Sequence, residues 1–333
     1  MRAQKARAFR SEEELVEWLR RHTRYSRSEL HRVGIGDDAA VLALRRGRRL
    51  LLTADLSIEG VHFDVRLHPP ESVGHRALAR SLSDIAAMGG TPRFALVSIA
   101  LSSRATRSWV KRFYAGLLAL ARRFGVELAG GDTARTLGNS LVDVVVAGEA
   151  PASQVLLRSG ARPGDHLYVA GELGAAALGL RLLRAKSGRN TFALRAHLYP
   201  EPQCKLGRYL AARRLASAAM DLSDGLSTDL ARLCAASGVG ARLRADRIPL
   251  TQFLPAPGPR APSPLALALH GGEDYRLLFT VPASKVSRLP SAFGGAQLYE
   301  IGEVTASRAI LLISSYGAEQ PLAPAGYDHF RKP

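Results

Sequence analysis

The chain has 333 residues, of which 47% are hydrophobic and 23% are charged, and its formal net charge is +17. This length suffices for two domains of ordinary size, and the hydrophobic fraction excludes an intrinsically disordered chain. No apolar run approaches the ~20 residues of a membrane-spanning helix, so the sequence predicts a cytoplasmic protein that does not enter the membrane.

The positive charge is spread evenly along the chain. Residues 1–150 carry 24 basic and 16 acidic side chains, and residues 151–333 carry 22 and 13. Because nucleic-acid-binding proteins concentrate basic residues in one patch or tail, we expect no specific binding of nucleic acid. The positive charge is expected instead to attract small anionic molecules. A nucleic-acid-binding or scaffold protein is the alternative to an enzyme.

The first half carries acidic residues beside predicted strands and helices. Residues 49–55 read as a buried strand that ends on Asp55, and a loop with Glu59 and His62 follows it. A helix from Pro70 to about Met88 carries Asp84 on or beside its apolar stripe. Aspartate is costly to bury alone, so a metal ion or a basic side chain is expected beside Asp84.

The rest of the first half alternates strands and helices. Residues 94–101 predict a strand, and Thr106 predicts the cap of a helix with an apolar stripe from Trp109 to Phe124. Tyr114 lies beside this stripe, where it either packs or reaches a ligand. Residues 126–129 then lead into G-G-D-T at 130–133, which reads as a strand ending in glycines and an acid. Glycines there let the backbone approach a phosphate closely.

The second half is organised around A-M-D-L-S-D-G-L at residues 219–226. Apolar residues lead into Asp221, a turn follows at 223–225, and a new helical stripe begins at Leu226. This pattern predicts a strand, an acidic turn and a helix, with Asp221 and Asp224 directed toward one point. Mg2+ prefers a site with only a few carboxylates, in which oxygen atoms of water and phosphate complete its coordination. For an isolated D-x-x-D, the alternative is that Asp224 only caps the helix.

Further signals in the second half complete the fold prediction. Residues 166–170 predict a strand, 171–183 and 203–215 predict helices, and the proline-rich segment 255–264 predicts a surface loop. Cys204 and Cys234 stand apart without a C-x-x-C motif, which predicts buried free thiols. Alternating elements favour an α/β (α+β) chain in two domains, residues 1–150 and 151–333. A G-x-G-x-x-G after a strand and a P-loop motif are both missing, so neither a dinucleotide fold nor a P-loop NTPase is supported.

Eight short motifs occur in an order that resembles the thiamine-monophosphate kinase family. They are G-I-G-D-D-A-A-V, T-A-D, S-L-S-D-I-A-A-M-G, G-G-D-T, R-S-G-A-R-P-G-D, D-L-S-D-G, G-G-E-D-Y and G-Y-D-H-F. The likeness runs from about residue 8 to residue 330. The resemblance implies the two-domain fold shared with aminoimidazole ribonucleotide synthetase. It also implies a homodimer paired through the N-terminal halves, and transfer of phosphate from ATP to thiamine monophosphate.

The resemblance also implies roles for individual residues. The implied Mg2+ ligands are Asp38, Thr53, Asp55, Asp84, Asp132, Asp221 and Asp224, with Asp84, Asp132 and Asp221 as the catalytic acids. The implied ATP contacts are Tyr114, Gly131, Asp132, Arg158 and Ser223, and the implied substrate contacts are His62, Glu273 and Tyr327. Ala54 departs from the family, which usually has a hydroxyl residue there, so one side-chain contact to metal is missing.

The chemistry of this reaction agrees with such residues. The second pKa of a phosphate monoester is ~6, so the acceptor oxygen is largely ionised at neutral pH and needs no general base. The obstacle is repulsion between two polyanions, which Mg2+ ions held by carboxylates would reduce. We therefore expect direct in-line transfer without a phosphoenzyme.

The alternative to a thiamine-monophosphate kinase is another ATP-using enzyme with the same fold. Selenophosphate synthetase normally uses a reactive cysteine or selenocysteine near its N-terminus, and this chain has no cysteine before Cys204. Aminoimidazole ribonucleotide synthetase would be expected to carry different substrate motifs. Gly271 to Tyr275 is also similar to the diguanylate cyclase signature, but the other seven motifs have no place in that family.

Overall fold

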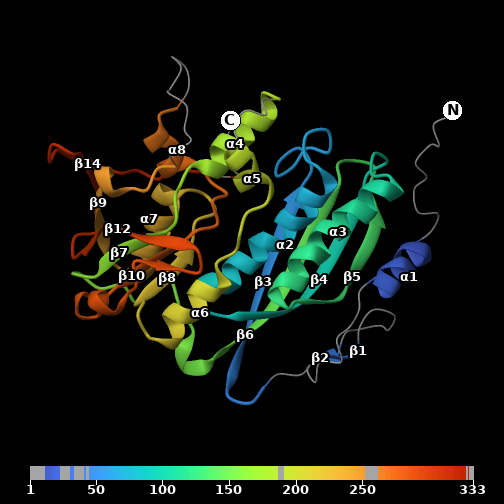
Figure 1. Ribbon diagram of the computed structural model, residues 1–333, viewed down its shortest axis with the longest axis horizontal. Helices are drawn as coiled ribbons and strands as arrows, with labels where there is room; N and C mark the ends of the chain where they lie inside the picture. The colour runs from blue at the N-terminus through green and yellow to red at the C-terminus, as the bar shows by residue number, and fades with distance from the viewer. Residues whose placement is uncertain are drawn as a thin grey trace. The chain divides into compact units, whose positions relative to one another are not determined.

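The computed structural model describes residues 12–22, 31–33, 41–42, 45–186, 191–251, 262–327 and 329 (Figure 1). The chain forms two compact units, of which the first comprises Met1–Ile85 and Thr91–Ala152 and the second Ala86–Gly90 and Ser153–Pro333. Within these ranges no helix has both the length and the apolar character required to cross a membrane.

The first unit contains a four-stranded sheet with two long helices on one face (Figure 1). Its helices are α1 (Glu12–His22), α2 (Pro70–Ala87, whose last two residues belong to the second unit) and α3 (Arg107–Phe124). Its strands are β1 (His31–Val33), β2 (Val41–Leu42), β3 (Arg48–Ile58), β4 (Thr91–Leu101), β5 (Glu127–Arg135) and β6 (Leu141–Pro151). The sheet order is β3-β6-β4-β5, and only the β4–β5 pair is parallel.

Strand β3 is longer and less buried than its sequence suggests. It pairs with β6 from Arg48 to Ile58, so Asp55 lies inside the strand and not at its end. Leu51 is 6% exposed but Leu52 is 64% exposed, because alternate residues face the helices and the helix-free side. The prediction of a buried strand ending on Asp55 was therefore wrong, since three consecutive leucines conceal the period of two. The G-G-D-T residues likewise lie within β5, which continues to Arg135.

Helices α2 and α3 pack with their backbones in close approach at two glycines. A Cβ atom at Gly74 would lie 2.0 Å from the carbonyl oxygen of Phe113, and one at Gly116 would lie 1.9 Å from that of Glu71. The predicted cap of α3 is confirmed, because the Thr106 hydroxyl accepts a hydrogen bond from the Trp109 amide at 3.2 Å.

The second unit contains an eight-stranded, mostly antiparallel sheet with the order β14-β13-β9-β12-β7-β10-β8 and β11 paired with β12. Its strands are β7 (His166–Ala170), β8 (Ala218–Asp221), β9 (Gly240–Arg244), β10 (Leu277–Val281), β11 (Ala292–Phe293), β12 (Ala296–Thr305), β13 (Ile310–Ile313) and β14 (Glu319–Pro321). Its helices are α4 (Ala175–Arg184), α5 (Thr191–Leu198), α6 (Cys204–Ala212), α7 (Leu226–Ser237) and α8 (Pro264–His270).

Most predicted elements of this unit are confirmed. The strand at 166–170 and the strand, turn and helix around Asp221 have the expected places. Helix α5 was not predicted, and Pro264 opens α8 instead of belonging to a loop, because proline is well tolerated in the first turn of a helix. Residues 255–261 of the predicted loop lie outside the described residues, and Ser263 caps α8.

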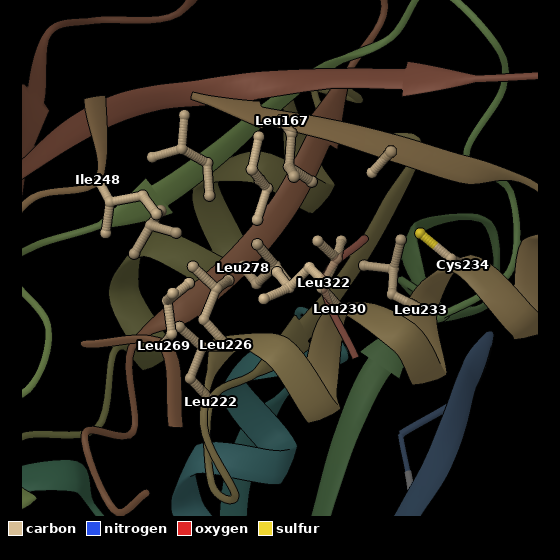
Figure 2. Close-up of a cluster of buried hydrophobic side chains, with 14 of the residues drawn as sticks. Leu167, Leu222, Leu226, Leu230, Leu233, Cys234, Ile248, Leu269, Leu278 and Leu322 are labelled. Carbon is tan, nitrogen blue, oxygen red and sulfur yellow. The ribbon is translucent and has the colours of Figure 1, made fainter. Parts of the chain in front are cut away.

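Leucines of α7 pack against the sheet to form the core of the second unit. Figure 2 shows Leu226, Leu230 and Leu233 in one cluster with Leu167 of β7 and Leu278 of β10. Both cysteines are free and buried, as predicted, and burial raises the pKa of the Cys204 thiol to about 12 and that of Cys234 to about 11.

Replacement of Gly116 by alanine tests the close approach of α2 and α3. Alanine in a helix interior is normally favoured over glycine by ~1 kcal/mol. Here we expect the opposite sign, a loss of ~1–3 kcal/mol in the free energy of unfolding, because the new methyl group meets a backbone oxygen that cannot move aside. Urea unfolding of G116A measures the change, with A119S on the exposed face of α3 as the control. Equal or higher stability of G116A would contradict this packing.

Candidate active site

In the first unit, β3 and α2 bring three of the predicted metal ligands together. Thr53 and Asp55 lie two residues apart on the helix-facing side of β3. The Thr53 hydroxyl donates a hydrogen bond to the Asp84 carboxylate, and the Ser81 hydroxyl donates to Asp55 at 2.9 Å. Ser81 and Asp84 are neighbours on α2 because residues three apart share a helix face. The result is a cluster of hydroxyl and carboxylate oxygens.

The basic residue Arg80 lies beside this cluster. The Arg80 guanidinium lies 3.6 Å from the Asp55 carboxylate and donates hydrogen bonds to the Leu56 carbonyl and the Ser57 hydroxyl. The sequence predicted a metal ion or a basic side chain beside Asp84. One partner of its carboxylate is the Thr53 hydroxyl. Ala54 is exposed on the opposite side of β3, so it lies away from the cluster.

The register of the sheet places Asp132 on a different row from Asp55. Asp55 pairs with Val144, and that row continues through Val97 to Gly131. Asp132 pairs with Ser98 on the next row, and side chains of successive rows point to opposite faces of a sheet. The register thus groups Asp55 with Asp84 but leaves Asp132 on the other face.

Asp38 and Gly131 are the remaining predicted contacts of this unit with metal or phosphate. Within the described ranges no three Asp, Glu, His or Cys side chains gather closely enough to hold a metal ion. Asp38, another predicted ligand, lies outside the described residues. Gly131 (φ +152°) has a packing requirement of its own, because a Cβ atom there would lie 1.9 Å from the Val97 carbonyl oxygen.

The remaining predicted contacts of the first unit differ in accessibility. His62 is partly buried, and its Nδ1 atom accepts a hydrogen bond from the Ile58 amide at 3.0 Å. Neighbouring Glu59 is 5% exposed and binds the Ser140 amide, so it anchors the loop. Tyr114 is 1% exposed and packs edge-on against Phe113, and burial raises the pKa of its phenol. Packing, the first of the two roles that the sequence left open for Tyr114, is observed.

In the second unit, a buried carboxylate absent from the predictions shapes the acidic turn. Asp229 accepts hydrogen bonds from the backbone amides of Asp224 at 3.0 Å and Gly225 at 3.1 Å. Burial raises its pKa to about 6. Asp224 is not the helix cap, since Gly225 holds that position. A carboxylate in the first turn of a helix is a recognisable signal, and it could have identified Asp229.

Arg232 neutralises this acidic turn. Its guanidinium lies 2.5 Å from the Asp224 carboxylate and 2.9 Å from that of Asp229. The predicted metal ligand Asp224 thus has a basic partner in the protein itself. Asp221, at the end of β8, is 3% exposed.

Two distant segments bind the backbone of the same turn. The amides of Glu273 and Tyr275 donate hydrogen bonds to the carbonyl oxygens of Ser223 at 2.8 Å and Leu222 at 2.9 Å. From near the C-terminus, the Tyr327 amide donates to the Asp224 carbonyl at 3.1 Å. Three motifs that the sequence singled out therefore meet at one turn. Tyr327 is 48% exposed.

Arg158 and Ser223, two predicted ATP contacts, lie in different surroundings. Arg158 is exposed, and its carbonyl oxygen accepts a hydrogen bond from the Ser237 hydroxyl at 3.0 Å. Ser223 is partly buried in the acidic turn. A cavity of about 220 Å³ is lined by Leu157 and Ser159, the neighbours of Arg158 in sequence, and by Arg214 and Ser217 among others.

Known proteins with similar sequences identify the family of this chain. Residues 36–150 match the family model "AIR synthase related protein, N-terminal domain", and residues 162–313 match its C-terminal counterpart. Thiamine-monophosphate kinase of Bacillus subtilis (strain 168) is 37% identical over 310 residues, which cover 90% of this chain and 94% of that protein. The chain belongs to the thiamine-monophosphate kinase family. The resemblance and the two-domain organisation inferred from the sequence are confirmed.

Solved structures of thiamine-monophosphate kinases have the same fold. The crystal structure from Stenotrophomonas maltophilia K279a superposes with a TM-score of 0.78 at 34% identity, covering 90% of this chain and 95% of that one. The structure described as "AaThiL complexed with AMPPCP and TMP" has a TM-score of 0.75 at 30% identity and covers 99% of both chains.

Replacement of Gly326 by alanine tests the docking of the C-terminal segment on the acidic turn. A Cβ atom at residue 326 would lie 2.0 Å from the Asp224 carbonyl oxygen. We expect G326A to release this segment and increase the rate of chymotryptic cleavage after Tyr327 several-fold, with little change in melting temperature. Mass spectrometry of timed digests measures the rate, and A325S is the matched control. Unchanged cleavage in G326A would contradict the contact.

Proposed function

We propose that this chain transfers the γ-phosphoryl group of ATP to thiamine monophosphate and releases ADP and thiamine diphosphate. The observation that carries the proposal is the 37% identity to a thiamine-monophosphate kinase over 90% of the chain. The related structure with AMPPCP and TMP supports the same pair of substrates. The meeting of three of the motifs at one turn adds support from this chain's own geometry.

The oxygen atoms around Asp84 fit Mg2+ by their chemistry. Thr53, Asp55 and Asp84 offer hydroxyl and carboxylate oxygens, the ligands that Mg2+ prefers in proteins. The proposed ligands of several Mg2+ ions are Asp38, Thr53, Asp55, Asp84, Asp132, Asp221 and Asp224, and Asp132 would serve a different ion from Asp55 and Asp84 because it lies on the other face of the sheet. Bound Mg2+ would supply positive charge to offset the repulsion between the two phosphate groups. Because the side chain of Ala54 is exposed on the other side of β3, the alanine leaves these oxygen atoms unchanged.

The residues of the chain then bind and orient the substrates. Gly131, Asp132, Arg158 and Ser223 are proposed to contact ATP, and His62, Glu273 and Tyr327 thiamine monophosphate, whereas Tyr114 is buried in the core of the first unit. Because the acceptor phosphate is already ionised near neutral pH, with a second pKa of ~6, no side chain needs to remove a proton. The transfer is therefore direct and in line, without a phosphoenzyme.

We further propose that the chain is a homodimer paired through its first unit. The helix-free face of β3 exposes Leu50 (45%), Leu52 (64%) and Leu56 (42%), and Leu96 of β4 adds to the same face (38%). A row of exposed leucines on a sheet is a feature of association surfaces. A second copy of this chain is the proposed partner.

Conversion of Asp84 to asparagine tests the role of the acidic cluster. The asparagine oxygen can still accept the Thr53 hydrogen bond, so we expect folding to be retained, while the loss of charge lowers kcat by ~100-fold or more. Asp221→Asn should behave in the same way. A coupled assay of ADP release at saturating Mg2+, ATP and thiamine monophosphate measures kcat. Asp246→Asn, at an exposed position of the second unit, is the control, and near-normal turnover of both D84N and D221N would count against the proposal.

Introduction of a charge at Leu52 tests the dimer. We expect L52D to halve the molar mass measured by light scattering after gel filtration, because a carboxylate would be desolvated at the centre of the proposed interface. Leu137→Asp, at an exposed turn of the same unit, is the control and should keep the mass of the unaltered chain. A monomeric unaltered chain, or a dimeric L52D, would refute pairing through this face.

A further inference from the structure

The backbone of the G-G-E-D-Y segment is held in a strained form. Among the described residues, four that are not glycine have a positive φ angle, and two of them are Glu273 (φ 69°) and Tyr275 (φ 49°). Left-handed backbone costs such residues roughly 1 kcal/mol each, so neighbouring contacts must impose it. Residues with strained backbone are frequent at functional sites.

Two sets of hydrogen bonds impose this conformation. The amides of Glu273 and Tyr275 bind the carbonyl oxygens of Ser223 and Leu222. Between them, the Asp274 carboxylate accepts hydrogen bonds from the amides of Gly174 at 2.8 Å and Ala176 at 3.1 Å, at the start of α4. The segment is thus fixed to the acidic turn on one side and to α4 on the other.

His197 of α5 fixes the side chain of Glu273. Its Nδ1 atom lies 3.2 Å from the Glu273 Oε2 atom, and the imidazole is fully buried while the carboxylate side chain keeps 24% of its surface exposed. Glycine at position 179 of α4 makes room, because a Cβ atom there would lie 2.8 Å from the His197 Cβ atom. A carboxylate can only accept hydrogen bonds, so this contact requires a proton on Nδ1.

We propose that His197 is a positioning residue for thiamine monophosphate and acts through Glu273. The inference rests on the proposed function, in which Glu273 contacts the substrate. The buried imidazole binds one oxygen of the Glu273 carboxylate and fixes the side chain. The carboxylate, which is partly exposed, then attracts the cationic thiazolium ring. A fixed carboxylate loses less conformational entropy when it binds a cation than a mobile one does.

Two amide substitutions at position 197 test this role. Asparagine places an N–H group near the position of Nδ1, whereas glutamine is equally polar but places it near Nε2. We expect H197N to keep the KM for thiamine monophosphate within about twofold of that of the unaltered chain. H197Q should raise it roughly tenfold, the effect of one lost hydrogen bond to a charged group. The KM for ATP should stay unchanged in both variants.

Three outcomes would overturn the proposal. They are an H197Q variant that behaves like the unaltered chain, equal impairment of H197N and H197Q, and a KM for ATP that rises in step. Calorimetric binding of thiamine monophosphate without ATP separates this proposal from the function itself, since a chain that binds it with the predicted order of variants but does not turn over refutes only the kinase activity.

A spectroscopic measurement covers the case in which H197Q does not fold. In the unaltered chain, 15N-histidine NMR should show Nδ1 of His197 protonated, with a shift that changes in Glu273→Gln. A His197 protonated on Nε2 alone would overturn the proposal, because such a ring cannot donate to the carboxylate.

Discussion

Backbone hydrogen bonding to the turn at residues 222–225 is the constraint on which the second unit depends. Polar backbone groups removed from water need partners. Here Asp229 binds amides of the turn, while the segments at 271–275 and 325–327 bind its carbonyl oxygens. Two regions far apart in sequence are thereby fixed to one short turn, and the candidate residues that they carry are placed with it.

Charge balance is the second constraint, and it differs between the units. In the first unit, Asp55 and Asp84 share a cluster with two hydroxyl groups, and Arg80 stands 3.6 Å from Asp55. In the second, Arg232 already pairs with Asp224 and Asp229. The proposed binding of Mg2+ would therefore compete with Arg232 for Asp224 and with Arg80 for Asp55.

Local patterns in the sequence predicted much of the fold. The helix from Thr106 and the strand, turn and helix around Asp221 followed from caps, acidic turns and helical spacing, which depend on neighbouring residues. The face of β3 could not be predicted in this way, since Leu50, Leu51 and Leu52 are equally apolar and only pairing with β6 decides which of them is covered.

The sequence likewise named some residues of the candidate site and missed others. The motifs named Asp84, Asp221 and Glu273 as candidates. Asp229 was missed although its contacts lie within five residues, since its place in the first turn of a helix was overlooked, whereas His197 could not be found locally because its partner Glu273 is distant in sequence. His197 lies in α5, a short helix that follows no strong apolar period and packs closely on α4 at Gly179. Tyr114 could not be decided from its spacing, since the same position beside a stripe suits packing and ligand contact alike.

The number of metal ions bound per chain tests the central proposal most directly. Mn2+ can stand in for Mg2+, and its binding is followed by electron paramagnetic resonance at saturating AMPPCP and thiamine monophosphate. The proposal predicts at least two Mn2+ ions per chain, with fewer in a chain that lacks the Asp84 carboxylate. A single ion per chain, unaffected by loss of that carboxylate, would contradict it.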